Sequence, residues 1–248
     1  MTDRPAGTDT AAAVSAEQRR LRPSEIFATL KSPLIYRNFL VHIFVMIPST
    51  IFLAYLAILL DGTFGWSRFA TLGARLGPAI VMFAAGATIV VYCYAYLLLI
   101  GDGSPGSHLG GPKHLVASGP YALVRHPSVI GKLLGVVALG ILVGSPSFMF
   151  IFIPILLTYS LITNRFIQEV NCERAFGPAY RDYRQRVPMI VPRLSDLRAA
   201  MTGRFLVVDI PDVETTDTSI RRVELFVYLI LLAGLLAGFF LLVKIVSS

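Results

Sequence analysis

Long apolar runs dominate the chain, and short polar segments separate them. Five runs approach or exceed the length of a helix that crosses a hydrocarbon layer about 30 Å thick. Gly144-Ser145-Pro146 joins the third and fourth runs, and this tight turn predicts an antiparallel helical hairpin. We therefore expect an all-α, polytopic membrane protein with about five spans, at 35–60, 76–100, 128–143, 147–166 and 223–246.

Composition supports this pattern. Hydrophobic residues make up 55% of the chain, charged residues 15%, and the mean hydropathy is +0.68. The first run begins too deep in the chain for a cleaved signal peptide, so we expect it to stay as an anchor. We divide the chain into an N-terminal cytoplasmic tail (1–33), a membrane core (34–194), a cytoplasmic linker (195–222) and a C-terminal transmembrane helix (223–248).

The charge distribution predicts the orientation in the membrane. Of the 22 Lys and Arg residues, 19 fall on one side of the five-span arrangement and 3 on the other. Positive charge is retained on the cytoplasmic side, so we expect the N-terminus and the polar segments 101–127 and 165–222 there. The C-terminus is then outside, and the inner (plasma) membrane is the expected location.

Cysteine and histidine usage narrows the chemistry. Cys93 and Cys172 offer no disulfide framework, and the four histidines show no metal-ligand spacing, so we predict no metal site. Basic residues are not interleaved with aromatic ones in the manner of a nucleic-acid surface, so we expect no nucleic-acid partner.

One polar stretch precedes the third run: Gly119-Pro120-Tyr121-Ala122-Leu123-Val124-Arg125-His126-Pro127. Proline is tolerated at the first helical position, so Pro127 predicts a helix start with His126 as its cap. The free N–H groups and the positive dipole end of that helix favour a nearby anionic group. The alternative is a juxtamembrane turn whose Arg125 and His126 meet only lipid headgroups.

A second polar stretch follows the fourth run. Arg165 and Glu169 are one helical turn apart at the predicted membrane edge, and Tyr180 and Tyr183 share a helix face. The alternative is a weak surface ion pair with two interfacial tyrosines. Both stretches are predicted on the same side, at the ends of adjacent hairpin helices, so we expect them to converge into one site.

The ordered motifs GDGSP, KHLVASGPYALVRHPSVIGKLLG and QEVNCERAFGPAYRDYRQRVPMIVP, placed around a hairpin, resemble the isoprenylcysteine carboxyl methyltransferase family. That superfamily of membrane methyltransferases includes phospholipid N-methyltransferases. The resemblance covers about 101–192. It implies an S-adenosylmethionine-dependent methyltransferase that acts on a lipid or prenylated acceptor at the cytoplasmic face, with a cofactor pocket made of loops and helix ends.

The resemblance also implies roles for residues. Arg165 and Glu169 are the catalytic candidates: Arg165 would orient a carboxylate acceptor, and Glu169 would hold the cofactor, tune Arg165 or deprotonate an amine. Arg125 suits the cofactor carboxylate, and Glu169 and the tyrosine faces suit its ammonium and sulfonium. The implied cofactor-binding residues are Leu115, Val116, Gly119, Pro120, Tyr121, Val124, Arg125, His126, Pro127, Glu169, Tyr180 and Tyr183.

Two departures from the family pattern leave the acceptor open. Val129 stands where the family has an aromatic residue, and Gln168 stands where it often has an acid. The rival interpretations are an NADPH-dependent reductase of the sterol type, a non-catalytic protein that kept the fold, and a transporter. The last span has three open roles: covering a lipid-facing slot, forming a homo-oligomer through Gly234 and Gly238, or anchoring the tail. We favour packing.

Overall fold

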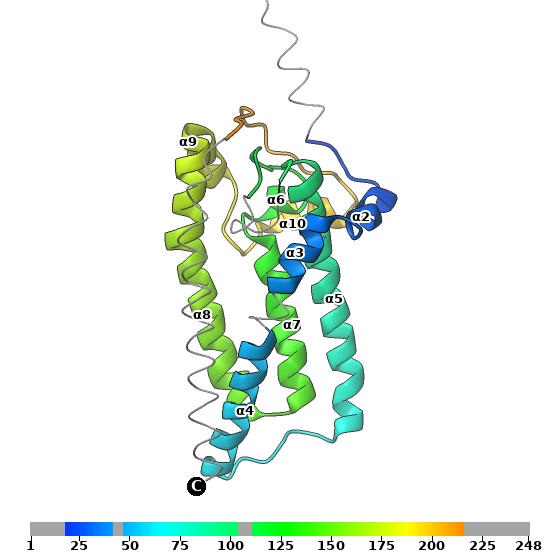
Figure 1. Cartoon of the computed structure of the whole chain (residues 1–248), viewed down its shortest axis with the longest axis vertical. Helices are drawn as coiled ribbons and strands as arrows, with labels where there is room; N and C mark the ends of the chain where they lie inside the picture. Colours follow the sequence, from blue (N-terminus) through cyan, green and yellow to red (C-terminus); the bar gives the residue numbers. More distant parts are fainter. Residues whose placement is uncertain (1–17, 42–46, 104–110, 216–248) are drawn as a thin grey trace, which may run out of the picture.

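The computed structural model describes residues 18–41, 47–103 and 111–215, and within these ranges the chain is helical (Figure 1). The predicted all-α class is confirmed for this part, where the extended pairing consists of two isolated antiparallel bridges. The helices are α2 (Pro23–Thr29), α3 (Pro33–Val41), α4 (Ile47–Phe64), α5 (Leu72–Leu99), α6 (Pro120–Leu123), α7 (Pro127–Val143), α8 (Ile153–Thr163), α9 (Glu169–Arg186) and α10 (Leu194–Met201), with π-helical turns η3 (Phe148–Phe152) and η4 (Asn164–Gln168) on either side of α8.

Two helices have the length and composition of membrane spans. These are α5, with 28 residues, and the helical stretch of 39 residues from η3 through α9, which is kinked at Gly177 and whose apolar part ends near residue 166. Helices α4 and α7 are apolar and shorter. Large apolar side chains point outward along this bundle, as expected of a surface that faces lipid. Among them are Ile51, Leu59, Ile80, Val81, Phe83, Phe150, Ile155 and Ile162.

The five predicted spans are thus found only in part. The first run, 35–60, contains α3 and α4, and residues 42–46 between them lie outside the described residues. The fourth run was expected to end near residue 166, but the helix continues to Arg186 because polar residues with good helix propensity follow it. The fifth run, 223–246, lies outside the described residues.

Helices α5 and α7 make the closest packing contact of the bundle through two glycines. A Cβ atom added to Gly86 would lie 2.5 Å from the carbonyl oxygen of Gly131, and one added to Gly131 would lie 2.7 Å from that of Gly86. Only glycine permits backbones to approach this closely. The sequence indicated a packing role for Gly131, but its partner Gly86 has no glycine at a spacing of four and was missed.

Two buried charges fix the hairpin end of the bundle. Asp61 on α4 accepts a hydrogen bond of 2.9 Å from the backbone N–H of Ser147, where the fourth-run helix begins. Arg75 on α5 donates to the carbonyl of Leu142, 2.7 Å away, at the end of α7, where Gly144 adopts a left-handed conformation. The negative Asp61 thus lies at the positive N-terminal end of one helix dipole, and the positive Arg75 lies at the negative C-terminal end of another. Both arrangements are electrostatically favourable.

The glycine contact yields a prediction for stability. Gly131→Ala and Gly86→Ala place a methyl group against backbone that has no room to move, so we expect each to cost about 1–3 kcal/mol. The measurement is the unfolding temperature in detergent micelles. Gly135→Ala is the matched control on the same helix, because its Cβ would meet open space. Equal unfolding temperatures for Gly131→Ala and Gly135→Ala would contradict the close contact.

Candidate active site

The Glu169 carboxylate is the centre of the candidate site. Its side chain is fully buried at the start of α9. Oε1 accepts hydrogen bonds from Arg125 Nε at 2.9 Å and Arg125 Nη2 at 2.7 Å, and Oε2 accepts one from Arg165 Nη1 at 2.8 Å. His126 Nε2 lies 3.5 Å from Oε1. We call these four residues the carboxylate cluster. The two polar stretches therefore meet, as the sequence predicted.

Arg125 is the residue that joins the two stretches. Besides its bonds to Glu169, its Nη1 donates to the carbonyls of Arg184 at 2.8 Å and Val187 at 2.7 Å. These carbonyls lie at the end of α9, where a cation opposes the helix dipole. All three guanidinium nitrogens thus donate within the chain. The resemblance assigned Arg125 to a cofactor carboxylate, whereas the structure uses it to position Glu169 and the end of α9.

Arg165 differs from Arg125 in exposure. Its side chain is about half exposed, against 10% for Arg125. It lies in η4, the π-helical turn directly before Glu169. Such turns widen a helix locally and are frequent at functional sites. Arg165 is therefore the cation of the cluster that a ligand outside the protein can reach.

The electrostatics of Glu169 keep it ionised. It lies beyond the apolar part of its helix, which ends near residue 166. Burial by itself raises the pKa of this carboxyl, but His126 and the hydrogen bonds from Arg125 outweigh burial and hold the pKa at about 2, below its usual 4.5. Glu169 is consequently an anion at neutral pH and a weak base.

Two buried polar atoms of α9, Asn171 Nδ2 and Tyr180 OH, lack a hydrogen-bond partner among the described residues. His126 Nε2 is also buried, and its contact with Glu169 Oε1 is long, at 3.5 Å. Unpaired buried polar atoms are costly, and a bound polar ligand that pairs with them removes that cost.

Two Gly-Pro turns shape the chain on either side of the cluster. Gly119 has φ 58° and ψ −124°, and Gly177 has φ 53° and ψ −126°; Pro120 and Pro178 follow them. A Cβ on Gly119 would lie 2.6 Å from the ring of Tyr96, so both conformation and space require glycine there. The sequence indicated the first turn. The second, which divides α9, was missed because helix-forming residues surround it.

The predicted tyrosines lie in the protein core. Tyr121, Tyr180 and Tyr183 are buried, and the Tyr183 hydroxyl donates to the carbonyl of Tyr121 at 2.7 Å. Burial raises the pKa of the Tyr121 hydroxyl well above 10, so it stays neutral. The role of these residues in cofactor binding stays a prediction, and so does that of their buried neighbours Leu115, Val116, Pro120, Val124 and Pro127.

A segment that the sequence placed in the linker packs onto the predicted cofactor loop. Val208 N donates to Ala117 O at 2.9 Å, and Gly119 N donates to Leu206 O at 2.9 Å. Ile210 is buried in the apolar cluster that contains Leu115 and Tyr183. Residues 205–215 have no helical periodicity and no motif in the sequence. Their support of the loop at 113–119 is therefore seen only in the backbone hydrogen bonds of the structure.

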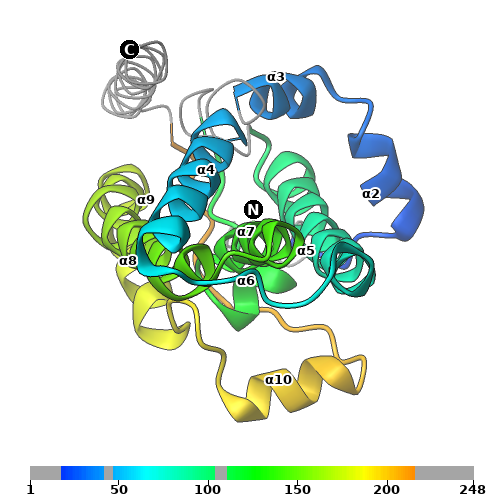
Figure 2. The same cartoon turned by 90° about the horizontal axis from the view of Figure 1, so that it is seen from below.

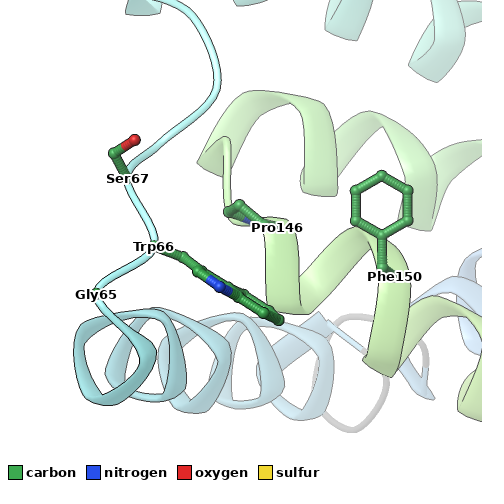
Figure 3. A pocket seen from close by; sticks show the side chains of 5 residues that line it. All are labelled: Gly65, Trp66, Ser67, Pro146 and Phe150. Atoms are coloured by element: carbon green, nitrogen blue, oxygen red, sulfur yellow. The ribbon is translucent and has the colours of Figure 1, made fainter.

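One hollow in the structure lies at the other end of the bundle. Figure 3 shows Trp66 between the loop after α4 and the start of the fourth-run helix, and the other lining residues are Gly65, Ser67, Pro146 and Phe150. It is next to the hairpin turn, one full length of α7 away from His126. This hollow is therefore separate from the carboxylate cluster.

Comparison with known proteins finds a likeness over the central segment. Residues 74–178, which contain the whole cluster, match the model of the phospholipid methyltransferase family. The match covers less than half of the chain. The protein-S-isoprenylcysteine O-methyltransferase of Schizosaccharomyces pombe is 31% identical over 104 residues, covering 38% of this chain and 42% of that protein. The resemblance found in the sequence is confirmed over this segment.

A second relative of this segment has a different description. The cobalt-zinc-cadmium resistance protein CzcN of Cupriavidus metallidurans is 33% identical over 98 residues, covering 38% of this chain and 44% of that protein. The chain thus spans less than half the length of either relative. No solved structure matches it.

The buried ion pair predicts a pH-dependent loss of stability. Glu169→Gln leaves Arg125 buried without its counter-charge, so we expect a loss of about 3–5 kcal/mol at neutral pH. A carboxyl with a lowered pKa contributes stability above its unfolded pKa of 4.5, and this is lost as the pH falls through about 2. The difference in unfolding temperature between wild type and variant should therefore shrink across that interval.

The control for this variant is Glu173→Gln, which removes a carboxylate that is 31% exposed and pairs with Arg184. We expect a smaller loss there, because water screens an exposed pair. A difference for Glu169→Gln that stays constant from pH 5 to pH 2 would contradict the assigned pKa.

Proposed function

We propose that this protein is an integral membrane methyltransferase that uses S-adenosylmethionine and methylates a lipid or prenylated acceptor at the cytoplasmic membrane face. The observation that carries the proposal is the position of the carboxylate cluster. It lies within the segment that matches membrane methyltransferases and at the end of the apolar helices. The positive-inside distribution of Lys and Arg supports the cytoplasmic side.

The unpaired polar atoms suggest how the cofactor is held. Asn171 Nδ2, Tyr180 OH and the weakly paired His126 Nε2 are the candidates to pair with its polar groups. Glu169 accepts bonds from both arginines, so its part is to orient Arg165.

The bound cofactor supplies an electrophilic methyl group on a positively charged sulfur. The acceptor would supply the lone pair for that methyl group, so the reaction needs no oxidant, reductant or metal from the protein. The protein contributes proximity, alignment and the removal of water. Arg165 orients an anionic acceptor at the membrane edge.

The ionisation of Glu169 helps to decide which chemical group of the acceptor is methylated. A carboxyl with a pKa of about 2 that is bonded to two arginines is a poor general base. An acceptor that is already a nucleophile, such as a carboxylate, needs no base. An amine acceptor would have to lose its proton to solvent first. We therefore favour methylation of an oxygen.

Activity is tested by incubating the purified protein with unlabelled S-adenosylmethionine and a lipid extract, followed by mass spectrometry. We expect a lipid product that gains fourteen mass units per methyl group. Arg165→Ala should lower turnover by about 100-fold, because the acceptor is no longer aligned. Arg181→Ala, which removes an exposed arginine that pairs loosely with Glu173, is the control and should keep full turnover. Full activity of Arg165→Ala would remove that residue from the site.

Cofactor binding is tested by calorimetry without any acceptor. His126→Ala removes a buried nitrogen whose contact with Glu169 is long, at 3.5 Å, and which the proposal pairs with the ligand, so we expect affinity for S-adenosylmethionine to fall about tenfold. Ser147→Ala is the matched control, since its hydroxyl is also buried and unpaired but lies at the other end of α7. An unchanged binding curve for His126→Ala, or a wild-type protein that binds NADPH instead, would contradict the proposal.

A further inference from the structure

Helix α10 exposes its large apolar side chains. Leu194, Leu197 and Met201 are 61%, 38% and 80% exposed, and the smaller Ala199 and Ala200 are half-buried. At spacings of three and four, the three large side chains form one stripe along the helix. A helix on a water-facing surface turns such a stripe inward. In α10 the stripe faces outward, which indicates that something apolar covers it.

Basic side chains border this stripe. Arg193 precedes the first helical residue and Arg198 lies beside the stripe one turn later; both are exposed. The acidic side chain, Asp196, is half-buried on the other face. A narrow apolar stripe with arginines at its margins is typical of helices that lie in the headgroup region of a membrane.

The length and direction of α10 suit this position. Its eight residues are about 12 Å long, too short to cross a bilayer. Figure 1 places it at the level of α6, and Figure 2 shows it lying across the direction of the bundle helices and outside them. It therefore runs parallel to the membrane plane at the end where the carboxylate cluster lies.

We propose that α10 is a docking element for anionic lipid, with Leu194, Leu197 and Met201 inserted at the acyl boundary and Arg193 and Arg198 on lipid phosphates. The negative surface potential of an anionic leaflet attracts each such arginine. This partner fits the charge and the shape of the helix better than a second copy of this basic chain, which would bring arginines together. The inference does not depend on the methyl-transfer proposal.

The position of α10 gives this docking a structural consequence. The helix connects the end of α9, which Arg125 holds, to residues 205–215, which pair with the predicted cofactor loop. On the far side of that connection, Arg20 donates to the carbonyl of Gly203 and lies 5.7 Å from the ring centroid of Phe205. Lipid that fixes α10 therefore fixes the start of the segment that supports the loop.

The test uses the full chain in lipid nanodiscs, in a Cys172→Ser background, with one spin label at a time. Labels at Leu194→Cys and Met201→Cys should collide several times more often with oxygen than with a water-soluble nickel chelate. The label at Ser195→Cys, on the opposite margin, should show the reverse. Replacing neutral phosphatidylcholine with a mixture containing phosphatidylglycerol should increase the contrast.

The double variant Arg193→Gln/Arg198→Gln should lose the effect of phosphatidylglycerol. The matched control is Arg181→Gln on α9, an exposed arginine outside α10 that should leave the effect unchanged. Nickel-accessible labels at both Leu194→Cys and Met201→Cys would overturn the proposal, and so would spin–spin coupling between labels of two copies. Neither measurement needs cofactor or turnover, so failure of the methyltransferase proposal would leave this result intact.

Discussion

The buried carboxylate of Glu169 is the interaction on which the site depends. Removing a carboxylate from water costs several kcal/mol, and the cost is met only when hydrogen bonds occupy its oxygens. Here both oxygens are occupied by arginines from different parts of the chain. Arg125 brings the loop before α7 to the helix that follows the hairpin, and its remaining nitrogen holds the end of α9. One ion pair thus fixes three segments relative to one another.

This ion pair works because the bundle beneath it is rigid. The contact between Gly86 and Gly131 holds α7 against α5, and Asp61 and Arg75 fix the opposite end of the hairpin. Helix α7 therefore has an anion near its first turn, Glu169, and a cation, Arg75, at its last carbonyls. Both charges oppose the helix dipole, so the same electrostatic rule stabilises the two ends of a short helix.

The sequence predicted those features that depend on local spacing. The i, i+4 pair of Arg165 and Glu169 and the start of α7 at Pro127 follow from helix geometry, and the structure confirms both. Arg125 and Glu169 are 44 residues apart in the sequence. Their contact could be predicted only because the predicted membrane topology placed both residues on the same side of the membrane. Topology does not show that each of the three guanidinium nitrogens of Arg125 donates a hydrogen bond within the chain.

Other features were beyond sequence reasoning for physical reasons. The kink at Gly177 lies among helix-forming residues, so periodicity conceals it, although Gly-Pro at 177–178 repeats the pair at 119–120. The residues of the π-helical turn that contains Arg165 are of the same types as those of an ordinary α-helix, so the sequence does not distinguish the turn. Residues 205–215 are stabilised by backbone hydrogen bonds with residues 113–119. Backbone groups are nearly the same in every residue, so such bonds do not require particular side chains and cannot be read from the sequence.

The length of α7 links this architecture to a lipid acceptor. Its 17 residues are about 25 Å long, less than the hydrocarbon thickness of about 30 Å. If its hairpin end reaches the far headgroups, its first turn ends below the near ones, unless the bilayer thins. The carboxylate cluster at that turn then lies at the depth where lipid headgroups meet acyl chains. In the proposed reaction, an acceptor anchored in the membrane would reach Arg165 there without leaving the bilayer, and a polar cofactor would approach from the water side. The short helix would then set the depth at which the two substrates of the proposed reaction meet.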